Sequence, residues 1–372
     1  MDVCEFSPSY VRGIAPYQPG KPIAEVAREY GLDESKIIKL ASNENPMGIS
    51  PLARAAIERE IADLSRYPDG NAFELKAAIS RKFSIDSAQI VVGNGSNDLL
   101  EMLAGAFLAP GRAAVFSQHA FAIYPLATQA RGAQCISVPA KQFAHDLDGM
   151  LAAITPATRI VFIANPNNPT GTFAAGPEIE RFLARSPKDV VVVLDEAYNQ
   201  YIPEEARYDS LRLLAAHPNL VVLRTFSKIY GLAGLRVGFG AMSPAIADLL
   251  NRVRQPFNVN SLALAAACAA LEDDAFVQRS FENNRAGMRQ LEQGFRGLGL
   301  DFIPSCANFV SFAVPREAGK PMGGVIFERL LRAGVIVRPI GGYEMPDHLR
   351  VTVGTPAEND AFLRALALSL KG

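Results

Sequence analysis

The sequence predicts an α/β protein with a mostly parallel, doubly wound sheet in a large domain and a smaller α+β unit. Two observations support this prediction. Short apolar runs recur along the chain and are continuous rather than alternating, which is typical of strands buried on both faces. Helical apolar spacing separates many of these runs, as it does in chains whose successive strands are parallel.

The apolar runs define the expected elements. Strands of the large sheet are expected at 90–92, 113–116, 160–164, 190–194, 220–223 and 237–240, with a helix at 97–107. A long helical pattern without strand signals follows at about 263–297, and we expect it to pack in the core and between the domains. Shorter strands at 309–312, 335–337 and 349–353, with helices between them, form the smaller unit.

The composition limits the class of protein. The chain has 372 residues, of which 49% are apolar and 20% charged, as expected for a globular enzyme of about two domains. Lys and Arg number 37 against 38 Asp and Glu, so the formal charge is −1 and no basic stripe indicates a nucleic-acid partner. The longest apolar segment, 262–271, is too short to span a bilayer, so no membrane partner is expected.

The cysteines indicate a reducing compartment. Cys4, Cys135, Cys268 and Cys306 are far apart and show neither a CxxC motif nor metal-ligand spacing. We therefore interpret them as reduced thiols of a cytoplasmic protein that has no metal site. The first residues have no basic flank and no apolar segment, so they predict no signal peptide.

The most informative segment is Thr225-Phe226-Ser227-Lys228, which follows the 220–223 strand. A Gly-rich bend at 231–234 comes next, and Arg236 lies eight residues after the lysine. Hydroxyls and a guanidinium bind phosphate well. An amine beside a bound phosphate indicates a lysine that forms a Schiff base with a phosphorylated aldehyde. By itself, the segment does not outweigh the simpler interpretation, a solvated loop lysine, which is what most lysines are.

A second candidate phosphate site follows the 90–92 strand. The chain turns through Gly93 and Gly95 into a helix that begins near Ser96 and Asn97. Amides at a helix start bind phosphate, and glycines let the backbone approach it closely. Asp98 stands where the dinucleotide fingerprint has its third glycine, so a nucleotide site is weakly indicated. A helix cap with nothing bound is the alternative.

A stiff turn follows the 160–164 strand. Residues 165–171 include two prolines and a glycine, and ligands of open α/β sheets bind at such carboxyl ends of strands. Asn168 is placed to donate a hydrogen bond to a ring oxygen of a cofactor. Turn formation alone also explains these residue types.

Asp195 ends the 190–194 strand and begins the segment Asp195-Glu196-Ala197-Tyr198. A carboxylate in this position is expected to be buried and to need a cation. A pyridinium N–H would be that cation, and Asp195 would keep it protonated. A cap of the next helix and a magnesium-binding acid are the alternatives, but no Gly-x-x-x-x-Gly-Lys-Ser/Thr loop accompanies the latter.

Together these four segments resemble the fold-type I pyridoxal-phosphate enzymes, and among them the aminotransferases. Leu-Ala-Ser-Asn-Glu-Asn-Pro at 40–46, Arg-Tyr-Pro-Asp at 66–69 and Leu-Arg-Val-Thr-Val-Gly-Thr at 349–355 are similar to the histidinol-phosphate aminotransferase group. The resemblance spans nearly the whole chain. It implies a seven-stranded, mostly parallel sheet in a pyridoxal-phosphate-binding domain at 46–269. The small domain and N-terminal arm would come from 1–45 and 270–372.

The resemblance also implies roles for the motif residues. Lys228 would form the Schiff base with the cofactor and then move the substrate proton, and Asp195 would pair with the pyridine nitrogen. Asn168 and Tyr198 would hydrogen-bond the ring oxygen. Lys228, Asp195 and Tyr198 are thus the expected catalytic residues. The cofactor phosphate would be held by Ser96, Asn97, Thr225, Ser227 and Arg236, and by Tyr67 from a second subunit.

The same resemblance implies a substrate side. Arg350 would bind the α-carboxylate or face that end, Arg338 and Tyr17 would bind a distal phosphate, and Asn43 would contact the substrate. Simpler interpretations are the polar face of a strand for Arg350 and a rim charge for Arg338. The ring-stacking position, usually a tyrosine in this family, is Phe121. It keeps the stacking surface, loses a hydroxyl, and resembles the branch that also accepts aromatic amino acids.

The sequence therefore predicts a homodimeric pyridoxal-phosphate aminotransferase of histidine biosynthesis, working on small molecules by a ping-pong mechanism. Glutamate and 2-oxoglutarate would be one pair, and histidinol phosphate and imidazole acetol phosphate the other. An aromatic-amino-acid aminotransferase and a pyridoxal-phosphate decarboxylase are enzyme alternatives. A cofactor-binding regulator is disfavoured because no basic helix-turn-helix segment is visible. The histidines show no triad or metal grouping and are expected at the surface or in loops: His119, His145, His217 and His348.

Overall fold

The central sheet has seven strands in the order β2-β8-β7-β6-β5-β3-β4. The computed structural model describes residues 2–371. The strands of this sheet are β2 (Ile90–Gly93), β3 (Ala113–Ser117), β4 (Gln134–Val138), β5 (Thr158–Ala164), β6 (Val191–Asp195), β7 (Leu220–Thr225) and β8 (Gly238–Met242). Strands β3 to β7 pair in parallel with their neighbours, whereas β8 is antiparallel to both β2 and β7. The prediction of a mostly parallel sheet is confirmed.

Strand β4 is the one strand of this sheet without a clear signal in the sequence. It lies at the sheet edge and pairs only with β3. Of its five residues, only Val138 is fully buried. An edge strand has one neighbour and less cover, so it needs no continuous apolar run.

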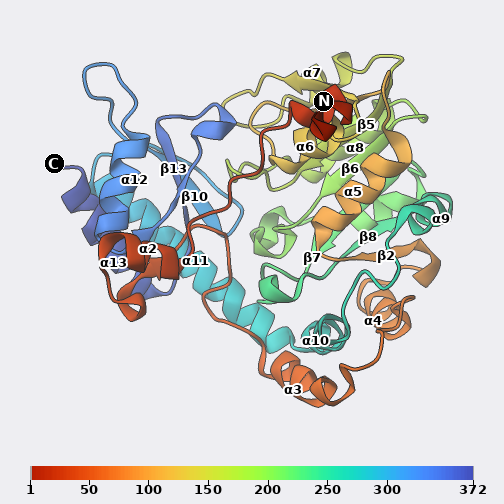
Figure 1. Cartoon of the computed structure of the whole chain (residues 1–372), viewed down its shortest axis with the longest axis horizontal. Coiled ribbons are helices and arrows are strands. Elements are labelled where there is room, and N and C mark those ends of the chain that lie inside the picture. Colours follow the sequence, from red (N-terminus) through yellow and green to blue (C-terminus); the bar gives the residue numbers. More distant parts are fainter. Residues whose placement is uncertain (1, 372) are drawn as a thin grey trace.

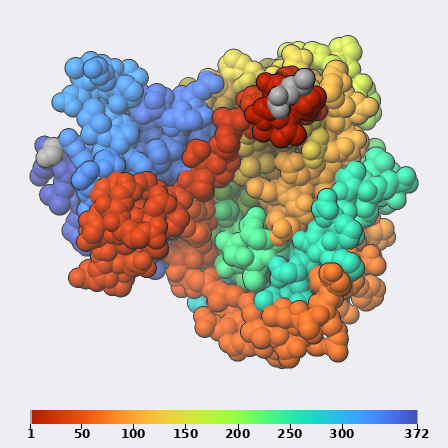
Figure 2. All heavy atoms as spheres, viewed as in Figure 1, coloured from red at the N-terminus to blue at the C-terminus, as the bar shows by residue number. Residues whose placement is uncertain are grey.

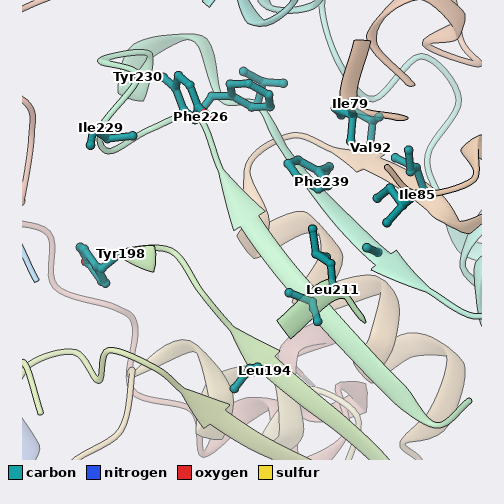
Figure 3. Close-up of a cluster of buried hydrophobic side chains, with 14 of the residues drawn as sticks. Ile79, Ile85, Val92, Leu194, Tyr198, Leu211, Phe226, Ile229, Tyr230 and Phe239 are labelled. Atoms are coloured by element: carbon teal, nitrogen blue, oxygen red, sulfur yellow. The ribbon is translucent and has the colours of Figure 1, made fainter. Parts of the chain in front are cut away.

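Helices cover both faces of the central sheet. One face packs against α5 (Ser96–Phe107), α6 (Ile123–Gln129) and α9 (Pro244–Val253). The other packs against α3 (Pro51–Glu60), α4 (Phe73–Phe83), α7 (Leu147–Ala152), α8 (Gly176–Arg185) and α10 (Ser261–Glu272). Within β6, Val192 and Leu194 face the second layer and Val191 and Val193 the first, which explains the continuous apolar run. Figure 3 shows part of the second layer, including Leu194, Phe226 and Phe239.

The small domain is built from both ends of the chain. Its four-stranded antiparallel sheet has the order β12-β13-β10-β9, and a separate parallel pair joins β1 to β11. These strands are β1 (Ile38–Lys39), β9 (Phe302–Ile303), β10 (Phe309–Ala313), β11 (Val335–Ile336), β12 (Arg338–Pro339) and β13 (His348–Thr352). The helices are α2 (Ile23–Tyr30), α12 (Gly323–Arg332) and α13 (Pro356–Ser369). The pairing of Ile38 with Val335 ties the two ends together.

The helical pattern at 263–297 forms two helices rather than one continuous helix. Helix α10 ends at Glu272, and α11 (Asp274–Gly297) begins after Asp273. The Asp273 side chain accepts a hydrogen bond from the Phe276 amide at 3.0 Å and one from the Ser50 hydroxyl at 2.6 Å. A capping aspartate therefore starts the second helix within an otherwise helical pattern. Helix α11 then runs from the large domain into the small one (Figure 1).

The N-terminal segment touches both domains. Its first elements are a 3-10 turn at Val3–Phe6 and α1 (Ser9–Arg12), and the Tyr10 ring lies against Gly132 of the large domain. Helix α2 packs its Val26 with Leu331 of α12 in the small domain. Between them, residues 13–22 lie across the face of the molecule (Figures 1 and 2). No helix in residues 2–371 combines the length and hydropathy needed to cross a membrane.

Candidate active site

A cavity of about 190 Å³ lies where the carboxyl ends of β5, β6 and β7 meet the small domain and the N-terminal segment. All the predicted site residues except Tyr67 line this one cavity. They are Tyr17, Asn43, Ser96, Asn97, Phe121, Asn168, Asp195, Tyr198, Thr225, Ser227, Lys228, Arg236, Arg338 and Arg350. The carboxyl ends of parallel strands meet at one edge of a sheet, and this edge gathers motifs that are far apart in the sequence.

Tyr67 lies elsewhere in this chain. Its side chain is 83% exposed and stacks on Phe257, with ring centroids 4.7 Å apart. It contributes nothing to the cavity of its own chain. The predicted role of Tyr67 requires a second subunit and stays a prediction.

Asp195 is buried at the floor of the cavity. One of its oxygens accepts a hydrogen bond from the Tyr124 hydroxyl at 2.9 Å, and the other accepts one from the Ala197 amide at 3.3 Å. It makes no ion pair with any residue between 2 and 371. Burial raises the pKa of this carboxyl to about 6, although both hydrogen bonds oppose the shift. The site thus holds an acid that lacks a cationic partner.

Lys228 follows β7 and reaches into the same cavity. Its Nζ donates a hydrogen bond to the Ser42 carbonyl at 3.2 Å. Burial, and next the positive charge of Arg350, lower the pKa of the amine to about 8. Near pH 7 about one-tenth of such an amine is neutral, far more than for an ordinary lysine, and the neutral amine is the nucleophilic form. The solvated-loop interpretation of this lysine is therefore wrong.

A cradle for an anion lies at the start of α5. The Gly95 N-cap has φ +80°, and no side chain caps the helix amides. A Cβ on Gly95 would lie 2.5 Å from Nη2 of Arg236, so only glycine lets the guanidinium lie over the helix start. Arg236 also donates to the Ser227 hydroxyl at 3.3 Å, and Thr225 accepts from the Ser227 amide at 3.1 Å. Helix amides, hydroxyls and a guanidinium converge there, as phosphate binding requires.

Polar side chains above Asp195 leave donors free toward the cavity. Arg350 donates through Nη1 to Oδ1 of Asn168 and through Nη2 to the Ala41 carbonyl at 2.8 Å. The amide nitrogen of Asn168 has no hydrogen-bond partner within the described chain and is available to a ligand. Asn43 donates to the Tyr198 hydroxyl at 2.9 Å. Burial raises the pKa of Tyr198 to about 12, so its hydroxyl remains a donor at neutral pH.

Two of these placements refine the expectations for the substrate side. Arg350 is 6% exposed and contacts the cavity, so it is not the polar face of an exposed strand. Asn43 is 1% exposed, and its side chain is engaged by Tyr198 and by Thr352, whose hydroxyl donates to Oδ1 at 3.2 Å. Asn43 therefore orients Tyr198 as well as lining the cavity.

The outer end of the cavity carries a second guanidinium. Arg338 on β12 donates to the Gln18 carbonyl at 2.6 Å, and its Cζ lies 5.6 Å from the centroid of the Tyr17 ring. Tyr343 lines the same end. Arg338 thus faces the cavity and also anchors the N-terminal segment.

Several residues of the site have no clear signal in the sequence. Ser42 and Tyr343 line the cavity, and Tyr124 lies behind Asp195. Tyr124 could be identified only by its place three residues after Phe121, which precedes α6 and has its ring centroid 5.8 Å from that of Tyr124. The expectation that the histidines lie at the surface or in loops is wrong for His348, which begins strand β13 and is half-buried. His119 lies in a turn, as expected, but it is only 9% exposed, and its Nδ1 lies 2.7 Å from the Tyr343 carbonyl. That contact fills the space between the two domains, so the side chain is buried.

These features fit pyridoxal phosphate. An unpaired buried acid suits a pyridinium, a partly neutral lysine suits an aldehyde, and the Gly95 cradle suits a phosphate. Phe121 lines the cavity as well. Residues 35–366 match the family model for class I and II aminotransferases.

The chain belongs to the class I and II aminotransferase family.

Curated relatives of this aminotransferase cover its whole length. Histidinol-phosphate aminotransferase 2 of Nitrosospira multiformis is 57% identical over 371 residues, which is 100% of this chain and 93% of that protein. Histidinol-phosphate aminotransferase 2 of Pseudomonas aeruginosa is 58% identical and aligns with 96% of this chain and 95% of its own. The histidinol-phosphate segments at 40–46 and 66–69 are thus part of a similarity that spans the whole chain.

Solved structures agree on the fold. The structure of the histidinol-phosphate aminotransferase of Sinorhizobium meliloti in complex with pyridoxal-5′-phosphate has a TM-score of 0.90 and 27% identity, covering 98% of this chain and 97% of that one. L-Threonine-O-3-phosphate decarboxylase of Porphyromonas gingivalis has a TM-score of 0.80 at 23% identity, covering 90% of this chain and 100% of that one. The second likeness concerns the fold alone, and it means that the reaction must be argued from the site.

Proposed function

We propose that this aminotransferase uses pyridoxal phosphate to exchange the amino group between glutamate and histidinol phosphate in histidine biosynthesis. The observation that carries the proposal is the single cavity that joins Asp195, Lys228 and the Gly95 cradle to two arginines at its substrate side. The high identity to curated histidinol-phosphate aminotransferases supports the choice of substrate.

The protein groups divide the chemistry among them. When bound, pyridoxal phosphate supplies an aldehyde that captures amines and a ring that accepts electrons from the substrate α-carbon. Asp195 would bind the ring N–H, while Asn168 and Tyr198 would donate to the ring oxygen. Burial lowers the pKa of the Lys228 amine to about 8, and this amine would carry the proton between the substrate α-carbon and the aldehyde carbon of the cofactor. Arg236 and the α5 amides hold the phosphate.

The two arginines suit a pair of dissimilar substrates. Arg350 is buried beside Asn168 and faces the end where an α-carboxylate of glutamate would lie. Arg338 lies at the outer end with Tyr17 and Tyr343, where a phosphate monoester or a side-chain carboxylate would lie. A guanidinium binds either anion through paired N–H groups.

The test is a comparison of kcat/KM for histidinol phosphate, phenylalanine and tyrosine, each with 2-oxoglutarate as acceptor. Histidinol phosphate is expected to be the preferred donor. A preference for phenylalanine or tyrosine would support the aromatic aminotransferase instead, which Phe121 in the cavity favours as the second candidate. Release of carbon dioxide without amino transfer would support the decarboxylase.

We also propose a homodimer whose two active sites are shared. Large apolar side chains are exposed on the surface around Tyr67. They are Ile61, Leu64, Phe73 and Phe257, and the exposed fractions of these four and Tyr67 range from 47% to 83%. A cluster of large apolar side chains of this kind is typical of a protein interface. Mixing inactive Lys228→Ala with inactive Tyr67→Ala subunits should restore activity, because the mixed dimer has one intact site. A lack of restored activity in verified mixed dimers would contradict the shared site.

Two further predictions complete the proposal. The large cofactor domain comprises 46–269, and the small domain and arm comprise 1–45 and 270–372. The protein works in the cytoplasm, and its four free cysteines support this location because thiols stay reduced there. Expression with a fluorescent tag checks the location, and limited proteolysis checks the boundaries.

A further inference from the structure

Tyr124 of α6 is held rigidly behind Asp195. Its side chain has no accessible surface. Its ring stacks on Phe162 of β5 with centroids 4.7 Å apart and planes 3° from parallel, and it meets the edge of Phe121 at 5.8 Å and 87°. Its hydroxyl donates to Oδ2 of Asp195 at 2.9 Å. With rings on two sides and the whole side chain closed off from solvent, this donor has one direction in which to point.

The groups that face Asp195 have opposing effects on its charge. Burial disfavours the carboxylate, as does Glu196, the next residue after the strand, whereas Lys228 favours it. Tyr198 also lies near enough to interact with Asp195, but as a neutral hydroxyl. Among residues 2–371, the only side chain that hydrogen-bonds the carboxylate is that of Tyr124. A hydrogen bond to the charged form of an acid stabilises that form.

We propose that Tyr124 is a positioning residue, whose hydroxyl keeps Asp195 ionised and turned so that it can bind the ring nitrogen of the cofactor. This inference rests on the proposed function, since it assumes that the cavity binds pyridoxal phosphate. Burial and the Asp195 charge hold the pKa of Tyr124 well above its usual range, so the hydroxyl keeps its proton and donates at every working pH. Tyr124 itself need not touch the cofactor, because it does not line the cavity.

The test measures binding by the apo-protein rather than turnover. The probes are pyridoxamine 5′-phosphate, which cannot form the covalent link to Lys228, and its 1-deaza analogue, in which C–H replaces the ring nitrogen. The ratio of the two affinities isolates the contact between Asp195 and the ring. Tyr124→Phe removes only the hydroxyl and keeps the stacked ring. The matched control is Tyr230→Phe, which removes another buried hydroxyl, within a separate core cluster.

Wild type should prefer pyridoxamine 5′-phosphate over the analogue. In Tyr124→Phe this preference should fall about three- to tenfold, because the lost hydrogen bond acts on the ring only indirectly, through the orientation and charge of Asp195. Asp195 of the wild-type apo-protein has a pKa of about 6. As pH is lowered, the preference of Tyr124→Phe should therefore be lost at a higher pH than that of wild type. The sign follows because removing a donor to the carboxylate raises its pKa, so protonation sets in earlier as pH falls. Tyr230→Phe should keep both properties.

A double-mutant cycle separates positioning from a general structural effect. In an Asp195→Asn background, Tyr124→Phe should change the affinity ratio no further, because the carboxylate is already gone. A ratio and pH midpoint unchanged in Tyr124→Phe would overturn the role of Tyr124 while leaving the proposed function intact. The role would also be overturned if Tyr124→Phe lowered the affinity ratio as much in the Asp195→Asn background as it does in wild type. A wild-type protein that binds neither probe would instead remove the proposed function, and the inference with it.

Discussion

Asp195 and Glu196 are buried neighbours at the end of β6, and they face opposite sides of the sheet. They differ in whether the fold supplies a cation for the carboxylate. Glu196 is 1% exposed, and its Oε2 accepts hydrogen bonds from Arg224 on β7 through Nε at 3.0 Å and Nη2 at 2.9 Å. Asp195 is 5% exposed and hydrogen-bonds only a hydroxyl and a main-chain amide within residues 2–371. One acid has its cation within the fold, and the other leaves that place to a ligand.

The difference separates structural from functional burial of charge. A buried carboxylate is costly unless a cation and hydrogen bonds compensate for lost hydration. Burial raises the pKa of both acids, and Arg224 opposes the shift at Glu196. On the cavity side, the fold buries the Asp195 carboxylate without a cation, and the bound cofactor would supply that cation. Changes on the cavity side should therefore affect chemistry, and changes on the opposite side should affect stability.

The largest effect is expected on the cavity side at Lys228. Lys228→Ala should reduce transamination by at least about 10⁴-fold, because it removes the nucleophile and the proton carrier. The urea midpoint of the apo-protein should not fall, since the amine makes one hydrogen bond, to Ser42. Loss of the visible absorbance of the lysine-linked cofactor is the second measurement. Turnover at the wild-type rate would show that the lysine is assigned wrongly.

The opposite side should respond in stability. Arg224→Met leaves Glu196 buried without its cation and should cost about 3–5 kcal/mol of unfolding free energy. The kcat of the folded fraction should change little, because Arg224 does not line the cavity. The control is the double variant Arg224→Met with Glu196→Gln, which removes both charges and should recover much of the loss. A large fall in kcat with full stability would reverse the comparison.

Asp195→Asn should exchange activity for stability. The kcat should fall by about 10²-fold or more, because the ring nitrogen loses its anionic partner. The apo-protein should gain about 1–3 kcal/mol at neutral pH, since the folded pKa of about 6 exceeds the ordinary 3.8 and ionisation therefore opposes folding. This gain should appear as pH rises through about 4 to 6 and vanish below that window. Urea denaturation at both ends of the window checks it, and an equal gain at both would contradict the assignment.

The smallest effect is expected at the rim of the cavity. Arg338→Ala should cost about 1.5–3 kcal/mol of transition-state binding for histidinol phosphate, or roughly 10- to 150-fold in kcat/KM. Phenylalanine, which has no phosphate, should lose much less. Because Arg338 also holds the Gln18 carbonyl, Gln18→Ala is a useful control that keeps this main-chain contact. Equal losses for both substrates would mean that Arg338 serves only to anchor the N-terminal segment.

The sequence predicted the cavity side better than the opposite side. Asp195, Asn168 and Lys228 each follow an apolar strand, and parallel strands bring such ends together whatever the register. The pairing of Glu196 with Arg224 depends on the register of β6 against β7, where Asp195 lies beside Leu223, and apolar runs do not encode it.

Tyr124 shows a second limit of the sequence. It lies in a short helix among apolar neighbours, and only the packing of α6 on β5 brings its hydroxyl to Asp195. The edge strand β4 was missed because it lacks the apolar run of a central strand. Tyr67 requires a second subunit, which a single chain does not contain.

The union of both chain ends in the small domain has a consequence for biosynthesis. Residues 38–39 pair with 335–336, and the Ala41 carbonyl accepts its hydrogen bond from Arg350. The ribosome makes these segments first and last, so the early segment must wait for nearly the whole message to be translated. Closing so long a loop is slow, and until then Val26 and Ala27 of α2 lack their cover from α12. A polypeptide stopped before α12 would therefore offer proteases an uncovered α2, and its cavity would lack Arg338 and Arg350.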